Sequence, residues 1–264
     1  MPRVYTAGEP IPHFLSYRGA QLQQTGTRAA QEDSFAFANI SDVTLMRTRG
    51  LLAVVADGMG GMKDGKLASE TAISRVKADF NTLDVAADIP AQLRDTMIRA
   101  NDEIYAQLGA QGGSTGIICV FYEEGLYYAS VGDSYLILKR GDNLYHLNRK
   151  QNMFTRLCLR QIRDNSLDRT PAETSPEKAA LTGYLGMRDL RDIDYLLRPI
   201  PLMEGDVILI CSDGVGGVLT EDQLKECLSA PEPEQMCRKM HEMVVAAERR
   251  YQDNYTALVI RCEY

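Results

Sequence analysis

Five aspartates stand where apolar segments of the chain begin or end, and this placement favours metal chemistry. Three follow strand-like runs and two precede them: Asp57, Asp133 and Asp213, and Asp33 and Asp253. A buried strand holds its terminal residue rigidly at the rim of a sheet, so we expect these carboxylates to lie near one another. Converging carboxylates repel one another strongly, so such a cluster requires cations. Any single Asp-Gly pair is more typical of a turn, and spacing alone leaves the convergence open.

The available ligand types favour a hard divalent cation. The chain has only three histidines, His13, His146 and His241, and they are scattered. A carboxylate-rich set without histidine selects Mg²⁺ or Mn²⁺, bound partly through water. Two such ions a few ångströms apart can share a water molecule and lower its pKa, which creates hydroxide for in-line attack on phosphorus. The expected chemistry is therefore metal-dependent hydrolysis of a phosphoester.

The elements that must position these residues can be read from local patterns. Short apolar runs bounded by Gly, Asp or Asn predict strands at about 34–40, 51–56, 114–121, 126–131, 135–139, 193–198, 206–212 and 255–262. Apolar residues three to four apart predict helices at about 66–79, 90–108, 149–163, 220–229 and 233–250. Strand and helix do not alternate strictly, so we expect an antiparallel sheet system with helices packed outside. An irregular, flap-like excursion is expected at about 149–190.

The composition is that of an ordinary soluble globular protein. The 264 residues are 45% hydrophobic and 25% charged, with a formal net charge of −7. This acidic balance argues against nucleic acid or an anionic membrane as the main partner. Six cysteines without a C-x-x-C pair, and an N-terminus without an apolar signal-peptide run, indicate a reduced protein of the cytoplasm. We expect a monomer with a single domain over residues 1–264.

Seven short motifs, in order along nearly the whole chain, resemble the type-2C metal-dependent protein phosphatases, and in particular their compact bacterial members. Each motif is modest alone, but seven in order are specific. They are Arg28-Ala-Ala-Gln-Glu-Asp33, Asp57-Gly-Met-Gly-Gly61, Gly113-Ser-Thr-Gly116, Val131-Gly-Asp-Ser134, Leu181-Thr-Gly-Tyr-Leu-Gly186, Asp206-Val-Ile-Leu-Ile-Cys-Ser-Asp-Gly214 and Asp253-Asn-Tyr-Thr256.

The resemblance implies an α+β fold in which two antiparallel β-sheets form a central sandwich with helices on both outer faces, a four-layer αββα arrangement. It also implies two Mn²⁺ or Mg²⁺ ions at the core site and a weaker third ion. The implied ligands of the core site are Asp33, Asp57, the carbonyl of Gly58, Asp213 and Asp253, with Asp33 and Asp57 central to catalysis. Glu32 would hold metal-bound water, and Asp133 would help Asp213 to bind the third ion.

Arg28 occupies the position at which the family clamps the substrate phosphate. A guanidinium is always charged and can present two parallel donors to phosphate oxygens. Standing alone it would be read as a surface arginine, but its spacing to Glu32 and Asp33 favours the phosphate role. The implied substrates are proteins carrying phosphoserine or phosphothreonine. The implied partner is a cognate serine/threonine kinase, whose phosphorylation of proteins such a phosphatase reverses.

Two segments depart from the family pattern. Met59 stands where eukaryotic relatives often carry a histidine proposed as general acid, and a thioether cannot donate a proton. Residues 147–152 read Leu-Asn-Arg-Lys-Gln-Asn, where relatives usually carry a Thr-x-Asp-His-Ser-like segment. That segment is not a metal ligand in the family. We therefore expect intact ion sites, whereas the neighbouring flap and the choice of substrate stay open.

Other functions receive less support from the sequence. Residues 60–67 fit G-x-x-x-x-G-K, but Leu67 stands where a nucleotide-binding P-loop needs Ser or Thr. Cys158 is followed by Arg163 without the glycine-rich loop of a cysteine-based phosphatase. The main alternative is a catalytically silent phosphatase-like module that binds phosphoproteins. Loss of a metal aspartate would mark that state, and every matched position is occupied here.

Overall fold

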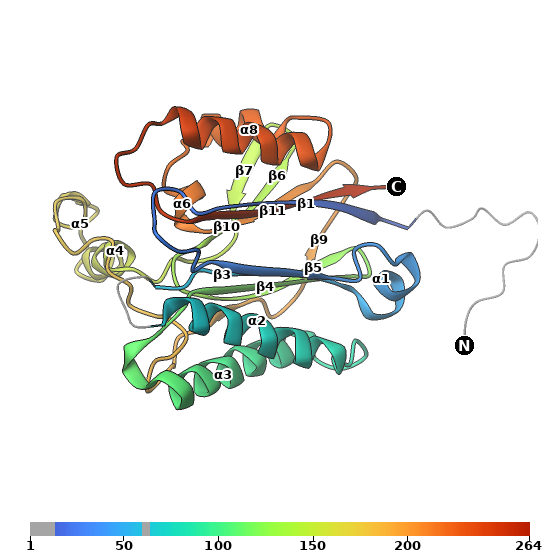
Figure 1. Ribbon diagram of the computed structural model, residues 1–264, viewed down its shortest axis with the longest axis horizontal. Coiled ribbons are helices and arrows are strands. Elements are labelled where there is room, and N and C mark those ends of the chain that lie inside the picture. The colour runs from blue at the N-terminus through green and yellow to red at the C-terminus, as the bar shows by residue number, and fades with distance from the viewer. Residues whose placement is uncertain (1–13, 60–63) are drawn as a thin grey trace, which may run out of the picture.

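The computed structural model describes residues 14–59 and 64–264, which form two β-sheets packed face to face (Figure 1). The first sheet has the strand order β1-β11-β10-β6-β7, and the second has the order β2-β3-β4-β5-β8, with β9 also paired to β5. Each pair is antiparallel. The strands are β1 (Ser16–Gln24), β2 (Ser34–Ala38), β3 (Leu51–Ala56), β4 (Gly116–Tyr122), β5 (Gly125–Val131), β6 (Tyr135–Arg140), β7 (Asn143–His146), β8 (Asp194–Tyr195), β9 (Ile200–Pro201), β10 (Val207–Cys211) and β11 (Tyr255–Glu263).

Helices cover both outer faces of this sandwich (Figure 1). The second sheet is covered by α2 (Gly65–Asn81) and α3 (Ile89–Leu108), and the first by α7 (Glu221–Leu228) and α8 (Pro233–Ala246). The shorter helices are α1 (Val43–Arg49), α4 (Met153–Arg163), α5 (Thr170–Glu173) and α6 (Asp213–Gly216), with a 3-10 turn at Gly109–Gln111. This arrangement confirms the predicted four-layer α+β fold.

Three apolar layers hold the four structural layers together. Between the two sheets lie fully buried side chains such as Leu51, Phe121 and Ile208. A second layer, which includes Met97, joins α2 and α3 to the second sheet, and a third, which includes Met240, joins α7 and α8 to the first. Because both faces of each sheet are covered, central strands are continuous apolar runs, and all six residues of β3 are buried.

Capping residues set the starts of the helices that cover the sheets. The side chain of Asp88 accepts a hydrogen bond from the amide of Ala91 at the start of α3, and Pro90 lies in its first turn. At the start of α7, Thr220 and Gln223 form a reciprocal capping box. These contacts satisfy amides that have no partner within the helix.

The sequence-based elements differ from the structure at several places. β1 was not predicted, because its sequence lacks an apolar run; its nine residues form a strand by pairing with β11. α1 and β7 were also missed. The predicted strand at 193–198 is wrong in length, since only the two residues of β8 pair there. The helix predicted from 149 begins at Met153, where the side chain of Asn152 caps it, and the helix predicted to reach 250 ends at Ala246.

Other sequence-based expectations concern the cysteines, the membrane and the P-loop pattern. The six cysteines are unpaired, and five of them are buried. Within the described part of the chain, no helix combines the length and apolarity needed to cross a bilayer. Residues 60–63, the first half of the G-x-x-x-x-G-K pattern and the end of the second family motif, lie outside the described residues, as does His13.

Candidate metal centre

The register of the second sheet brings Asp33 and Asp57 together. Ser34, the first residue of β2, pairs with Ala56, the last residue of β3, so the two aspartates stand directly beyond this pair. The backbone of Asp57 is fixed further, because its carbonyl accepts the amide of Thr115 at 2.8 Å and its amide donates to the hydroxyl of Thr115 at 3.1 Å. The two carboxylates are therefore placed by strand pairing rather than by a mobile loop.

The register of the first sheet brings a second group of aspartates to the same end of the sandwich. Cys211 at the end of β10 pairs with Ala257 of β11 on one side and with Tyr135 of β6 on the other. The chain reaches an aspartate within a few residues of each of these three positions. The aspartates are Asp133, Asp213 and Asp253.

Asp33 connects the two sheets. It precedes β2 of the second sheet, yet its Oδ2 accepts a hydrogen bond of 2.9 Å from the hydroxyl of Ser212, which follows β10 of the first sheet. The same hydroxyl accepts the amide of Thr256 in β11 at 3.0 Å. Asp33 is only 1% exposed, so this carboxylate sits at the seam where the two groups of aspartates meet.

The other oxygen of this carboxylate shows that the site fits a metal. Oδ1 of Asp33 is buried and has no hydrogen-bond donor among the described residues. A buried carboxylate oxygen without a partner costs free energy, and native proteins rarely leave one unsatisfied. A divalent cation at this position would satisfy it, and hard cations prefer carboxylate oxygens of this kind.

Crowding raises the pKa of the aspartates at this site. Loss of solvent is the largest cause for Asp57, whose pKa lies well above its usual range, and the charges of Asp33 and Asp213 add to it. The pKa of Asp213 is raised to about 7 by loss of solvent and by the charges of Asp133, Asp253 and Asp33, although the residue remains exposed at the mouth of the site. Burial also raises the pKa of Asp33 and of Asp133. These carboxylates can all be ionised together only when cations neutralise them.

The aspartates approach one another without closing a cage. Within residues 14–59 and 64–264, no three acidic, histidine or cysteine side chains are already arranged around a single point as the ligands of one ion. The mutual effects on pKa nevertheless place all five aspartates within electrostatic range of their neighbours. An open site of this kind fits ions that keep several water ligands, as Mg²⁺ does.

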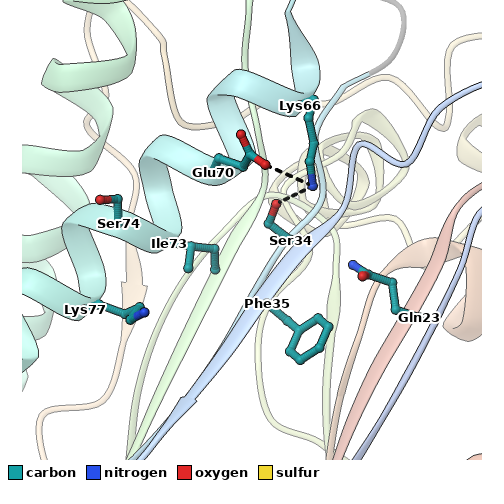
Figure 2. A pocket seen from close by; sticks show the side chains of 8 residues that line it. All are labelled: Gln23, Ser34, Phe35, Lys66, Glu70, Ile73, Ser74 and Lys77. Atoms are coloured by element: carbon teal, nitrogen blue, oxygen red, sulfur yellow. Dashed lines mark hydrogen bonds and ion pairs between the residues drawn. The ribbon is translucent and has the colours of Figure 1, made fainter.

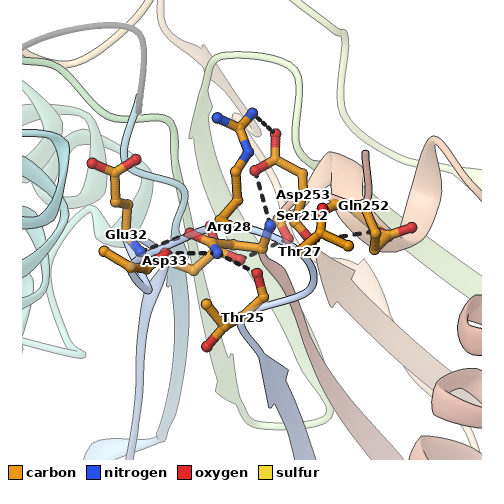
Figure 3. Close-up of polar contacts among 11 residues, drawn as sticks. Thr25, Thr27, Arg28, Glu32, Asp33, Ser212, Gln252 and Asp253 are labelled. Carbon is orange, nitrogen blue, oxygen red and sulfur yellow. Dashed lines mark hydrogen bonds and ion pairs between the residues drawn. The ribbon is translucent and has the colours of Figure 1, made fainter. Parts of the chain in front are cut away.

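Arg28 lies at this site, as predicted, and contacts one of the expected ligands. Figure 3 shows its guanidinium reaching toward Asp253, and its Nη2 lies 2.6 Å from Oδ2 of that residue. The arginine side chain is half exposed, at 51%. A charged donor group thus lies at the rim of the aspartate cluster with access to solvent.

The loop that carries Glu32 is fastened by Asn254, a residue whose role was not predicted. The amide of Glu32 donates to Oδ1 of Asn254 at 2.7 Å. The side-chain nitrogen Nδ2 of Asn254 donates to the carbonyls of Thr25 at 2.8 Å and Ala30 at 2.9 Å. One buried side chain therefore ties the segment from Thr25 to Glu32 to the start of β11.

Gly58, the predicted carbonyl ligand, occupies a place where only glycine fits. A Cβ atom at this position would collide with the carbonyl oxygens of Gly65 and Glu32. The residue also forms a bridge with Ser114 next to β4. Close backbone approach therefore requires glycine here, independently of any metal.

A cavity of about 380 Å³ lies beside the start of β2, and Lys66 on its wall contacts the backbone of Asp33 (Figure 2). The ammonium of Lys66 donates to the carbonyl of Asp33 and to the hydroxyl of Ser34, both at 3.1 Å, and lies 3.5 Å from Glu70. Sequence patterns did not identify this role, since Lys66 was noticed only as part of the rejected P-loop pattern.

The structure brings the predicted residues together at one end of the sandwich. They are Arg28, Glu32, Asp33, Asp57, Gly58, Asp133, Asp213 and Asp253. Three side chains that support them were not predicted from the sequence: Lys66, Ser212 and Asn254. Ser212 and Asn254 each adjoin a predicted ligand, and this adjacency was the available signal.

Comparison with known families and relatives agrees with this geometry. The sequence model of the family described as Protein phosphatase 2C matches residues 29–249. The serine/threonine phosphatase stp of Listeria monocytogenes is 27% identical over 219 residues, which cover 79% of this chain and 83% of that protein. The protein phosphatase PhpP of Streptococcus pneumoniae is 25% identical over 191 residues, which cover 69% of this chain and 74% of that protein.

Solved structures share the fold over almost the full length. The serine/threonine phosphatase Stp1 from Staphylococcus aureus superposes with a TM-score of 0.79 at 20% identity, covering 97% of this chain and 100% of that one. The catalytic domain of the serine/threonine protein phosphatase PstP, solved in complex with two manganese ions, has a TM-score of 0.74 at 24% identity and covers 95% and 100% of the two chains.

Proposed function

The chain belongs to the protein phosphatase 2C family, and from this membership we propose that it hydrolyses phosphoserine and phosphothreonine in proteins with the help of two divalent cations. The observation that carries the proposal is the cluster of five aspartates at one end of the sandwich, with a buried oxygen of Asp33 that lacks a partner. Relatives named as serine/threonine phosphatases support the substrate class.

The donor set fits Mn²⁺ or Mg²⁺. Asp33, Asp57, the carbonyl of Gly58, Asp213 and Asp253 would hold the ions. Bound ions of this kind lower the pKa of a water ligand, so that it attacks phosphorus near neutral pH, and they neutralise charge on the phosphoryl oxygens. The manganese ions in the PstP complex agree with this choice of metal.

The protein's own residues would bind and orient the phosphate. The guanidinium of Arg28 is half exposed beside Asp253, so it can present its remaining donors to an arriving phosphate group. Glu32 lies next to Asp33, on a loop that Asn254 holds in place, where its carboxylate can orient water. Positioning by such fixed groups contributes to the rate because reacting groups are already aligned.

No side chain at position 59 can protonate the leaving alkoxide. The terminal methyl group of Met59 packs against Gly113, and a thioether has no proton to donate. In the proposed mechanism, water in the open site supplies the proton. For this reason we expect substrates with good leaving groups, such as p-nitrophenyl phosphate, to be hydrolysed faster than phosphothreonine peptides.

The test is hydrolysis of p-nitrophenyl phosphate and of a phosphothreonine peptide, each measured with Mn²⁺, with Mg²⁺ and with chelator. We expect activity only with metal, and we expect Asp213→Asn to lower kcat/KM by about 100-fold or more, because it removes a ligand of an ion that would neutralise transition-state charge. Asp222→Asn in the first turn of α7 makes the same chemical change at an exposed position and serves as the matched control.

Two outcomes would contradict the proposal. Activity that persists in chelator would exclude the metal-dependent route. A folded protein that binds the phosphothreonine peptide but turns over neither substrate with any metal would identify a silent phosphoprotein-binding module instead.

A further inference from the structure

The divergent segment 147–152 lies against the turn that carries Asp133. The side chain of Asn148 accepts the amide of Leu136 at 2.8 Å and donates to the carbonyl of Ser134 at 2.9 Å. These bonds fasten the segment just after the aspartate. They involve backbone groups of the turn between β5 and β6 and of the start of β6, so the contact does not depend on flexible surface side chains.

The other end of the segment is fastened just before the aspartate. Gln151 exchanges two hydrogen bonds with Gly132: its backbone amide donates to the glycine carbonyl at 2.8 Å, and its Oε1 accepts the glycine amide at 2.9 Å. Gln151 is 2% exposed, and its Nε2 donates to the carbonyl of Asp192 at 2.8 Å. The segment thus brackets Asp133 on both sides, with Lys150 between the two anchors.

The side chain of Lys150 is half-buried and directed along the same turn. Its Nζ lies 3.2 Å from the centre of the Tyr135 ring, which is a cation–π contact. Tyr135 follows Asp133 by two positions in the chain, so this contact holds the ammonium at the turn that carries Asp133. Lys150 makes no direct ion pair within the described residues. Burial lowers the pKa of its ammonium, whereas the negative charges of Asp133 and Asp213 favour the charged form. In return, the Lys150 ammonium is the main charge that favours ionisation of Asp133, against the effect of burial.

We propose that the ammonium of Lys150 neutralises Asp133 and takes the place of a third divalent cation, so that the centre holds two ions rather than three. The inference rests on the proposed function, because it concerns ions of the same site. A fixed positive charge near Asp133 and Asp213 repels a further divalent ion and reduces the negative charge that would attract it. The third ion that the family resemblance implied therefore does not fit this chain.

The experiment is the number of Mn²⁺ ions bound per chain, measured on the full chain by equilibrium dialysis with elemental analysis. Lys150→Met removes the charge and keeps an apolar stem that can pack on Tyr135, whereas Lys150→Arg keeps the charge as the matched control. We expect two ions for the wild type and for Lys150→Arg, and three for Lys150→Met. The affinity of the additional site should increase on the order of tenfold or more when the charge is removed.

A second variant locates the additional ion. Introducing Asp133→Asn into Lys150→Met should return the number of ions to two, because the third site would lose its carboxylate. Circular dichroism melting verifies that each variant is folded, and Lys150→Gln replaces Lys150→Met if the latter does not fold.

The possible results separate this inference from the proposed function. Three ions on the wild type, or two on the folded variant that lacks the Lys150 charge, would overturn the role of Lys150 and leave the two-ion core intact. A wild type that binds no Mn²⁺ would instead overturn the proposed function, and the inference with it.

Discussion

At the scale of single residues, the buried carboxylate of Asp33 depends on contacts from several elements. Ser212 donates to its Oδ2, while Gln23 and Lys66 donate to its backbone carbonyl at 3.2 and 3.1 Å. The lysine comes from the first turn of α2 and therefore couples the position of this helix to the start of β2. A residue that never touches a metal can in this way set the position of a metal ligand.

Lys66→Met should weaken metal binding more than turnover. Loss of the hydrogen bonds to Asp33 and Ser34 should make the free energy of Mn²⁺ binding less favourable by about 1 kcal/mol, because Asp33 is then held less firmly. This corresponds to a roughly fivefold higher Mn²⁺ concentration for half-maximal activity. We expect kcat at saturating Mn²⁺ to change by less than about twofold, because the ligands themselves are unchanged. The measurement is activity as a function of Mn²⁺ concentration.

Lys77→Met is the matched control for this prediction. Lys77 lines the same cavity from α2 but is exposed and contacts neither Asp33 nor Ser34 in the described structure (Figure 2). Equal effects of the two substitutions would show that the charge of the cavity, rather than the contact to Asp33, controls metal binding.

At the scale of elements, α4 presents a basic surface next to the candidate site. Arg156, Arg160 and Arg163 are spaced so that they share one face of the helix, and they line a cavity of about 790 Å³ together with Arg149 and Lys150. Two carboxylates, Asp164 and Asp192, also line it. Because the whole chain carries a net charge of −7, this surface is a local exception. Its charge favours an acidic segment of a substrate protein.

Charge reversal on α4 should affect peptide substrates selectively. The double variant Arg156→Glu and Arg163→Glu should raise KM for a phosphothreonine peptide flanked by Asp and Glu by about tenfold or more, because like charges then oppose binding. Neither arginine has an ion-pair partner among the described residues, so we expect the fold to persist. Hydrolysis of p-nitrophenyl phosphate, which is too small to reach α4, should be unchanged. Equal KM changes for acidic and basic peptides would contradict the prediction.

At the scale of the whole molecule, the sandwich concentrates negative charge at the seam between its two sheets. Asp33 and Asp57 adjoin strands of the second sheet, Asp213 and Asp253 lie close to strands of the first, and Asp133 lies in the turn from β5 to β6 that joins the two sheets. Without cations, ionisation of these groups opposes the packing of the sheets at this end. Metal ions that bind the folded state but not the unfolded state would stabilise the protein by mass action.

The metal-free protein should lose stability as the pH rises. The pKa of Asp213 is about 7 in the folded protein against a usual value of 3.8, so the folded state binds more protons than the unfolded state between these values. Stability from this group is therefore fully present below about pH 4 and is lost as the pH rises through about 7. We expect a lower Tm at pH 8 than at pH 5 in chelator, and saturating Mn²⁺ should narrow the difference.

Asp213→Asn provides the control, because it removes the titrating group. In chelator, the variant should show a smaller change of Tm between pH 5 and pH 8 than the wild type. A wild-type Tm that rises with pH in chelator would contradict the sign of the prediction. Circular dichroism melting gives both values under the same conditions.

Local sequence patterns predicted those strands, helices and candidate ligands that depend only on neighbouring residues in the chain. The continuous apolar runs of β3 and β10 identified strands buried on both faces, and Asp57 and Asp213 at their ends identified candidate ligands. The apolar spacing of α3 predicted a helix that the structure confirms. Residue type and spacing were sufficient here because burial on two faces and helical amphipathicity each leave a periodic trace in the sequence.

Tertiary structure decided what depends on residues far apart in the chain. β1 forms by pairing Ser16 with Glu263, and no pattern within its polar sequence signals that pairing. The support of Asp33 by Lys66 and Ser212, and the contact of Lys150 with Tyr135, likewise depend on segments that are not neighbours in the chain. The sequence by itself therefore determined which residues could bind a metal. Only the packing of the two sheets decided which side chains stand around them, because those contacts join segments that are far apart in the chain; Asn254, for example, is 229 positions from Thr25.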